Sequence, residues 1–221
     1  GWKDVYLEAV RKGFRDRALA EDCCMISDPK SAAIYMARRG ADNALEHHID
    51  RALDASEAYA ELRRAMPSVT PKALSKYQRE YPNFDRAAVE NALIAYGVYL
   101  EDGQALFHAG HWPGGGEVVT DRPFSTSYCP QIALRNVDHN AKAYIAGYID
   151  LMVVRTFAAC TQCFAFRRRG TSKGHEKEVL FNKGARLTLR SRELVREDYP
   201  VARYGHPERH VPVFVLEVDL S

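Results

Sequence analysis

The stretch Glu178-Val179-Leu180-Phe181-Asn182-Lys183-Gly184-Ala185-Arg186-Leu187-Thr188-Leu189 decides the fold of this chain. Two short apolar runs flank Asn182-Lys183-Gly184, whose residue types are typical of a tight turn. The pattern predicts a strand over 178–181, a turn, and a second strand over 185–189. Glu176 and Glu178 stand at the start of the first strand. Because side chains two residues apart share a face of an extended strand, we expect both carboxylates on one face.

Further strands are expected on both sides of this stretch. Residues 149–157 form a short run rich in apolar and β-branched side chains. Residues 211–218 are apolar on both faces, which predicts a strand inside a sheet, with Pro212 near its start. Leu106-Phe107-His108-Ala109-Gly110 and Pro123-Phe124-Ser125-Thr126-Ser127 are two more candidate strands. One helix is expected over residues 130–145.

The first part of the chain has a helical pattern. Ala, Leu, Glu and Arg dominate residues 1–102, and apolar residues recur at helical spacing between residues 5 and 14 and between 45 and 60. Pro67, Pro71 and Pro82 interrupt the pattern. Asp85 is placed to cap a helix over 86–100 that stops at Gly103. We therefore expect an α+β protein with four or five helices in residues 1–102 and a strand-rich part over 103–221.

Composition excludes several classes of protein. The 221 residues carry a net charge of +2, with 46% hydrophobic and 27% charged residues, which is typical of a folded globular chain. No apolar run reaches the roughly 18 residues that a membrane-spanning helix needs, so no membrane association is expected. The chain begins without Met or a signal-peptide pattern, and we expect it to be part of a longer protein. Five cysteines do not form a disulfide framework, and Cys160-Thr161-Gln162-Cys163 lacks the partners that a zinc site needs. We expect no metal.

One loop concentrates positive charge. Residues 103–221 carry 16 Lys and Arg against 12 Asp and Glu, whereas residues 1–102 carry 15 against 17. The densest basic stretch is Phe166-Arg167-Arg168-Arg169-Gly170-Thr171-Ser172-Lys173-Gly174-His175, which contains no acidic residue.

Three segments taken together resemble the mono-ADP-ribosyltransferase toxins. In that family a first strand ends in Arg or His, a second strand carries an aromatic residue and Ser-Thr-Ser, and a later strand begins with Glu-x-Glu after a substrate-recognition loop. His108, Phe124-Ser125-Thr126-Ser127 and Glu176-Lys177-Glu178 follow this order, and the resemblance covers about residues 104–220. His108 stands where the Arg-Ser-Glu subclass has Arg, and the His-Tyr-Glu subclass lacks Ser-Thr-Ser. The chain is therefore a hybrid, and His111 is an alternative to His108.

The resemblance implies a mixed two-sheet core, residues 103–221, with a cleft for NAD between the sheets. It implies that Glu178 stabilises an oxocarbenium-like transition state and accepts a hydrogen bond from the ribose 2′-hydroxyl. Ser125 would orient Glu178, Glu176 would act as general base toward the acceptor, and His108 would hold the adenosine-side ribose or phosphate. NAD would also contact the remaining hydroxyls of the motif, Thr126 and Ser127. Candidates for stacking on nicotinamide are Tyr128, Tyr144 and Tyr148.

The acceptor expected from the basic loop is a nucleic acid, with RNA preferred. Arg167, Arg168, Arg169 and Lys173 would attract a phosphate backbone, and Phe164 and Phe166 would stack on bases. Three alternatives stay open: transfer to a protein side chain, an NAD glycohydrolase with water as acceptor, and a nucleic-acid-binding module without enzymatic activity.

The layout of the chain also resembles the C-terminal toxin module of a polymorphic Rhs-type bacterial effector. That resemblance implies secretion, action in the cytoplasm of a target cell, and a cognate immunity protein that blocks the NAD cleft. The helical region, residues 1–102, would either cover one face of the sheet or help to bind the adenine end of NAD.

Overall fold

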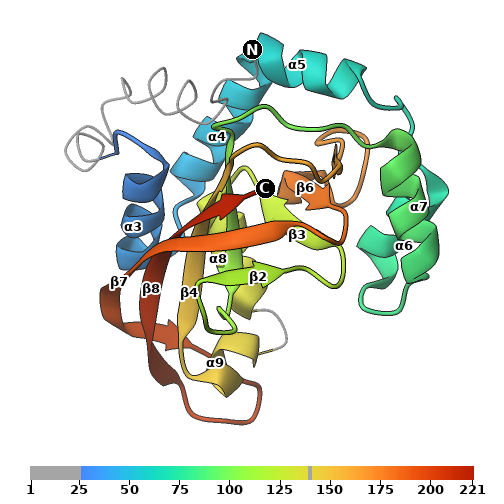
Figure 1. Ribbon diagram of the computed structural model, residues 1–221. Helices are drawn as coiled ribbons and strands as arrows, with labels where there is room; N and C mark the ends of the chain where they lie inside the picture. The colour runs from blue at the N-terminus through green and yellow to red at the C-terminus, as the bar shows by residue number, and fades with distance from the viewer. Residues whose placement is uncertain (1–25, 139–140) are drawn as a thin grey trace.

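The computed structural model describes residues 26–138 and 141–221, and it has helices first and strands afterwards (Figure 1). The α+β class is therefore confirmed. The periodicity between residues 5 and 14 lies outside the described residues. The helices that the structure describes before the first strand are α3 (Pro29–Arg39), α4 (Asn43–Ala55), α5 (Glu57–Arg64), α6 (Lys72–Glu80) and α7 (Arg86–Tyr96).

Outside residues 139–140, the elements of the second part are the strands, two short α-helices and the 3₁₀ turn η2. In chain order it comprises β1 (Ala105–Gly110), β2 (Glu117–Val119), β3 (Phe124–Ser127), α8 (Pro130–Asp138), α9 (Lys142–Ala146), β4 (Ile149–Thr156), β5 (Cys163–Ala165), η2 (Gly174–Glu176), β6 (Glu178–Phe181), β7 (Arg186–Val201) and β8 (Arg209–Leu220). The six strands expected from the sequence are present as β1, β3, β4, β6, β7 and β8, but β7 continues to Val201, well past residue 189, and the sequence did not predict β2 or β5. The single helix expected over 130–145 is instead divided into α8 and α9.

Local chemistry sets the helix boundaries. Ser56 accepts a hydrogen bond from the Tyr59 N–H and starts α5, so the continuous periodicity between residues 45 and 60 is split in two. Asp85 caps α7 as predicted, accepting from the Ala88 N–H. The expected stop at Gly103 is wrong, because α7 ends at Tyr96 and the backbone turns to extended geometry at Gly97.

The strands lie in the order β2-β7-β8-β4-β1-β3-β6-β5. β8 is flanked by β7 and β4, which confirms that its two apolar faces place it inside the sheet. β4 and β8 pair in parallel and the other pairs are antiparallel, so the sheet is mixed as expected. Pro212 lies near the start of β8.

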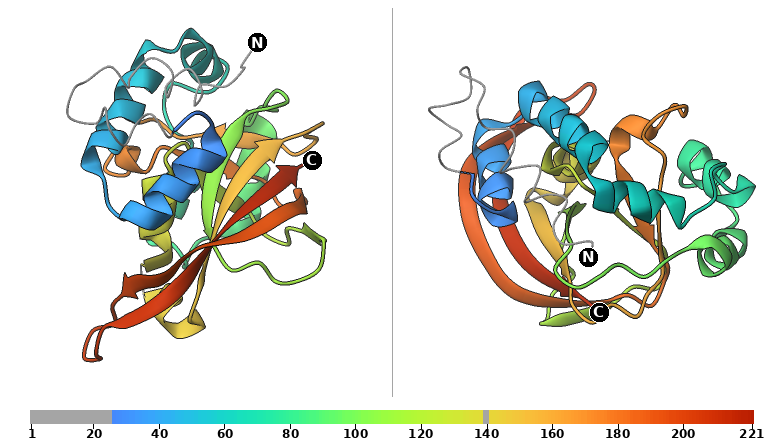
Figure 2. Two further views of the ribbon diagram at one scale, coloured as in Figure 1. Left: turned by 90° about the vertical axis from the view of Figure 1, so that its left-hand side faces the viewer. Right: turned by 90° about the horizontal axis from the view of Figure 1, so that it is seen from above.

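The core differs from the expectation in one respect, because hydrogen bonds join the eight described strands into one sheet rather than two. The junction is narrow: β1 and β3 share a single registered pair, Phe107 with Ser127. A single residue pair joins the two strands at one point, so their directions can diverge away from it. The strongly curved sheet in Figure 2 is consistent with such a joint.

The helices and the sheet share one hydrophobic core. Helix α3 packs against β4, β7 and β8, α8 packs against β1, and α7 packs against β5. Leu45 and Leu93 of the helices belong to the same cluster of buried side chains as Phe107 and Val215 of the sheet. None of the helices in the described residues is long and apolar enough to cross a bilayer.

Replacing Asp85 by Ala tests the cap of α7. The substitution leaves the Ala88 N–H without its side-chain acceptor, so the free energy of unfolding should fall by about 1 kcal/mol in urea denaturation. Asp121→Ala, a change at an exposed bend, is the matched control. Equal losses in the two variants would show that the cap does not stabilise the helix.

Candidate active site

Strands β3 and β6 bring Ser125 and Glu178 together. They pair antiparallel, with Ser127 opposite Glu178 and Ser125 opposite Leu180. Ser125 is therefore the diagonal neighbour of Glu178 on the same face, within reach of a long side chain. The Ser125 hydroxyl donates to Glu178 Oε1 at 2.7 Å. The structure thus brings together the two residues at the centre of the sequence-based hypothesis.

Helix α6 supplies further donors that the sequence did not reveal. Gln78 Nε2 donates to the other carboxylate oxygen, Glu178 Oε2, at 2.9 Å. The buried Tyr77 hydroxyl lies near the same carboxyl group and helps to lower its pKa. No local signal distinguishes Gln78 from other polar residues of a surface helix. Gln78 lies 100 residues from Glu178 in the sequence, and only the tertiary structure shows that it donates a hydrogen bond to Glu178.

Glu178 is a buried carboxyl group with a perturbed pKa. Only 6% of the residue is exposed, and this burial raises its pKa from 4.5 to about 7. The donors Gln78 and Ser125 oppose the rise, while the nearby carboxylate of Glu176 adds to it. A carboxylate held by two donors in a dry site can stabilise a developing positive charge or accept a proton near neutral pH.

Glu176 does not share a strand face with Glu178, so that expectation is wrong. Glu176 lies in the turn η2, and β6 begins only at Glu178. Lys177 between them has φ of 49°, in the left-handed region, which breaks the alternation of side chains. The Glu176 carboxylate forms an ion pair with Lys173, with Nζ 2.8 Å from Oε1. It nevertheless lies near enough to Glu178 to influence its pKa.

His108 on β1 contacts the backbone of Ser125, the residue whose hydroxyl binds Glu178. Its Nδ1 is 2.7 Å from the Ser125 carbonyl oxygen, whereas His111 contacts the Tyr148 carbonyl at 3.2 Å. Burial lowers the pKa of His108 to about 4, so the ring is neutral near pH 7. Because a carbonyl only accepts, Nδ1 carries the proton and Nε2 is an acceptor. A Cβ at Gly110 would lie 3.0 Å from Nε2, so glycine there leaves this nitrogen room.

The other two hydroxyls of the motif are used within the fold. The Thr126 hydroxyl donates to the Val179 carbonyl at 2.8 Å, and the Ser127 hydroxyl donates to the Glu176 carbonyl at 2.7 Å. Thr126 thus ties β3 to β6, and Ser127 holds the turn that precedes β6. The structure brings neither hydroxyl to the Glu178 carboxylate.

The basic loop is not a free cationic surface. Arg168 has only 8% of its side chain exposed and forms ion pairs with Asp50 and Asp54 of α4. Arg169 also pairs with Asp54, at 2.7 Å, and Lys173 pairs with Glu176. Arg167 is exposed and donates to the Ser68 carbonyl at 2.8 Å. Neighbouring carboxylates of α4 and of Glu176 therefore compensate most of the positive charge of the loop.

The expected stacking of bases on Phe164 and Phe166 is wrong. Phe164 is fully buried and Phe166 is 2% exposed, stacked on Tyr77 at a ring distance of 6.5 Å. Both rings belong to the core beneath α6. Both rings are buried against other parts of the protein, and the local sequence does not indicate this burial.

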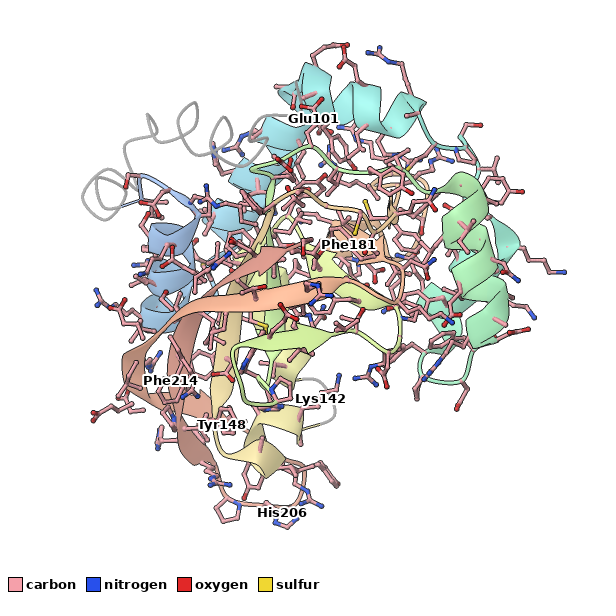
Figure 3. All side chains as sticks on the ribbon, in the orientation of Figure 1. Glu101, Lys142, Tyr148, Phe181, His206 and Phe214 are labelled. Carbon is pink, nitrogen blue, oxygen red and sulfur yellow. The ribbon has the colours of Figure 1, made fainter. Side chains whose placement is uncertain are left out.

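The three tyrosines proposed for nicotinamide lie in different surroundings. Tyr128 is 1% exposed and packs edge-on against Tyr59, so its ring has no open face. Tyr148 and Tyr144 lie on the β8 side, near Arg192 and His206 respectively. Figure 3 places Tyr148 and His206 toward one end of the molecule and Phe181 of β6 near its centre.

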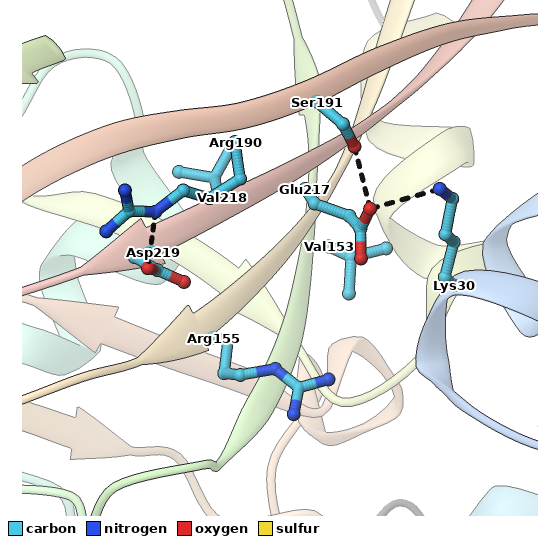
Figure 4. A pocket seen from close by; sticks show the side chains of 8 residues that line it. All are labelled: Lys30, Val153, Arg155, Arg190, Ser191, Glu217, Val218 and Asp219. Carbon is cyan, nitrogen blue, oxygen red and sulfur yellow. Dashed lines mark hydrogen bonds and ion pairs between the residues drawn. The ribbon is translucent and has the colours of Figure 1, made fainter. Parts of the chain in front are cut away.

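A separate surface pocket lies beside α3, over β4, β7 and β8 (Figure 4). Its charged groups largely pair with one another, as in the Lys30–Glu217 contact at 3.0 Å and the Arg190–Asp219 contact at 2.7 Å. It is lined by Lys30, Val153, Arg155, Arg190, Ser191, Glu217, Val218 and Asp219. None of these residues belongs to β3 or β6, so the pocket is not part of the candidate site. Within residues 26–138 and 141–221, no three His, Cys, Asp or Glu side chains are grouped to hold a metal ion.

Comparison with known proteins gives a distant likeness of fold. No protein-family profile matches the chain, and no curated protein matches its sequence. Among solved structures, it is similar to the C2-I component of the C2 toxin from Clostridium botulinum, with 12% identity, a TM-score of 0.42, and coverage of 74% of this chain and 45% of that chain. The chain thus spans less than half the length of C2-I.

Two further structures resemble it over most of their length. The Vis toxin from Vibrio splendidus, an ADP-ribosyltransferase, has 16% identity and a TM-score of 0.37, covering 97% of this chain and 90% of that chain. Plx2a from Paenibacillus larvae, an ADP-ribosyltransferase toxin, has 9% identity and a TM-score of 0.36, covering 99% and 97%. Likeness at this level assigns no activity to this chain. The argument for a function rests on the geometry of the site.

Glu178→Gln should change how stability depends on pH. The folded-state pKa of Glu178 is raised, so the native protein binds the proton more tightly than the unfolded chain. The protonated carboxyl therefore makes its full contribution to the free energy of unfolding below pH 4.5, and this contribution is lost as the pH rises to about 7. This loss amounts to about 3 kcal/mol.

We accordingly expect the Gln variant to be more stable than the wild type at pH 8 and nearly equal to it at pH 4.5. Urea denaturation at the two pH values measures the difference. Glu193→Gln, an exposed carboxyl, is the control. A pH-independent difference for Glu178→Gln would refute the burial of an ionisable group at this position.

Proposed function

We propose that this chain is an NAD-dependent mono-ADP-ribosyltransferase. The observation that carries the proposal is the pairing of the Ser125 hydroxyl with the buried carboxylate of Glu178 at 2.7 Å. A desolvated anion held in place by donors is what stabilises an oxocarbenium-like sugar. The proposal agrees with the three motifs of the sequence.

In the proposed reaction the bond between nicotinamide and its ribose breaks, and its electron pair leaves with nicotinamide. Positive charge develops on the ribose, and the ionised Glu178 stabilises it. Ser125 and Gln78 each hold one carboxylate oxygen, so that its position is set before NAD binds. The ADP-ribosyl group then forms a bond to the acceptor, whose proton passes to a base.

His108 is proposed to accept a hydrogen bond from an NAD hydroxyl. Its neutral ring presents Nε2 as an acceptor only, since Nδ1 donates to the Ser125 carbonyl. An acceptor nitrogen suits a ribose hydroxyl and does not suit a phosphate oxygen. Of the two roles suggested by resemblance, the ribose contact is therefore favoured.

The acceptor is proposed to be a macromolecule, and the structure changes the case for RNA. Pairing of Arg168, Arg169 and Lys173 with carboxylates removes most of the charge that would disfavour a protein acceptor. The remaining support for RNA is a groove lined by Arg63, Arg64, Met66, Ser68 and Arg167. Both acceptor classes are therefore tested in the same experiment. The sequence-based context, a secreted effector acting in a target cell and countered by an immunity protein, is proposed on resemblance alone.

The test is transfer of radiolabel from the adenylate part of NAD to a cell lysate. Wild type should label a macromolecule. Glu178→Gln should reduce both labelling and nicotinamide release at least 100-fold, because the positively charged transition state loses the carboxylate that stabilises it. Glu176→Gln should reduce labelling more than nicotinamide release, because its role is with the acceptor. Thr126→Val, which alters a hydroxyl bound to the backbone, is the comparison variant.

Digestion identifies the acceptor. Label removed by RNase would support RNA, and label removed by protease would assign a protein. Nicotinamide release without any labelled macromolecule would instead indicate an NAD glycohydrolase. Salt-sensitive RNA binding with no consumption of NAD would identify a nucleic-acid-binding module and refute the enzymatic proposal.

Gln78→Met should move the pH profile of NAD cleavage. The reaction needs ionised Glu178, so the rate should rise with pH around its pKa of about 7. Methionine preserves the volume but removes the donor that stabilises the carboxylate, so the pKa rises further. We expect the rising limb of log kcat/KM against pH, which reports the pKa of the free enzyme, to shift upward by about one unit. Lys76→Met, an exposed change on the same helix, should leave it in place, and an unmoved limb in Gln78→Met would exclude this role.

A further inference from the structure

Lys177 is a buried cation that the proposed chemistry does not use. It stands between Glu176 and Glu178, and its side chain is fully buried. Its Nζ reaches α4, lying 3.3 Å from Glu46 Oε1 and 3.2 Å from Asp50 Oδ2. Lys177 therefore connects the segment that carries both site carboxylates to a helix of the first part of the chain.

Helix α4 presents a row of acids to this segment. Glu46, Asp50 and Asp54 are spaced four residues apart, so they lie on one face of the helix. Asp50 binds Lys177 and, with Asp54, also binds the largely buried Arg168. The loop before β6 is thus held by α4 at both of its ends.

The backbone at Lys177 forms the corner from which β6 begins. The Tyr128 N–H donates to the Lys177 carbonyl at 3.2 Å, and the Lys177 N–H donates to the Gly174 carbonyl at 3.2 Å. The Ser127 hydroxyl binds the Glu176 carbonyl on the same side. The corner is therefore fixed to the end of β3 through its backbone and to α4 through the Lys177 side chain.

Stability alone gives little reason for a lysine here. A buried ion pair is often no better than well-packed apolar residues, because two charges must be desolvated. Left-handed backbone is also better suited to glycine. What an ion pair to two carboxylates adds is a fixed direction and distance between α4 and the corner.

We propose that Lys177 is a positioning residue: anchored on Glu46 and Asp50, it fixes Glu176 and Glu178 in place relative to Ser125. This inference rests on the proposed function. It gives α4 a part in catalysis, although no residue of α4 is placed against the Glu178 carboxylate.

The first test compares Lys177→Met, Lys177→Gly and Lys177→Arg in steady-state NAD cleavage. A carboxylate displaced by about 1 Å should reduce kcat roughly 10- to 100-fold, while KM for NAD stays within about twofold. Met and Gly should both show this loss, because both lack the anchor. Arg should retain more kcat than either, since it keeps the charge. Full kcat in Lys177→Gly would show that only the left-handed backbone matters and would overturn the proposal.

The second test approaches the same anchor from the helix. The double variant Glu46→Gln/Asp50→Asn should reproduce the loss of kcat, and adding Lys177→Met to it should cause little further loss. Arg135→Ala is the matched control, because Arg135 binds the same Glu46 at 2.9 Å without touching the corner. Wild-type kcat in a folded Glu46→Gln/Asp50→Asn variant would overturn the proposal.

A stability measurement separates failure of this inference from failure of the proposed function. If the wild type cleaves no NAD, the enzymatic proposal fails, and the coupling between Lys177→Met and Glu178→Gln in urea denaturation at pH 8 still decides the positioning role. If Lys177 fixes the position of Glu178, the two substitutions should have non-additive effects on the free energy of unfolding. Additive effects would overturn the inference.

Discussion

The burial of the Glu178 carboxylate is the constraint on which the rest of the site depends. The group stands at the start of β6 and is buried, and this desolvation raises its pKa to about 7. Such a group reduces the stability of the fold once it is ionised. The neighbouring donors, Ser125 and Gln78, are therefore needed both to hold the carboxylate and to limit this cost.

The helices of the first part of the chain complete the site. Helix α6 supplies Gln78 and Tyr77 to Glu178, and α4 holds the loop before β6 through ion pairs to Arg168 and Lys177. These interactions neutralise charges that appear unpaired in the sequence. The same pairing removes the simplest electrostatic reason for preferring RNA over protein as the proposed acceptor.

Strands were the most predictable part of the protein. The boundaries of β6 agree with the sequence-based prediction, because a short apolar run between turn residues is a local signal. The hydrogen bond between Ser125 and Glu178 follows from antiparallel pairing once both strands are known. The orientation of Glu176 was not predictable, since a single left-handed residue, Lys177, interrupts the alternation. The burial of Phe164 and Phe166 was also missed, because it depends on distant residues such as Arg63 of α5 and Tyr77 of α6 packing against them.

By itself the sequence determined the α+β class, the positions of six of the eight described strands, and the hydroxyl and carboxylate that meet at the centre of the site. Periodicity and turn residues act over a few neighbours, so they are legible in a linear sequence. Only the tertiary structure decided that Gln78 reaches Glu178 and that Lys177 reaches Glu46, pairs separated by 100 and 131 residues. Such contacts form because packing of distant elements buries their polar groups together, and no local pattern encodes which groups will meet.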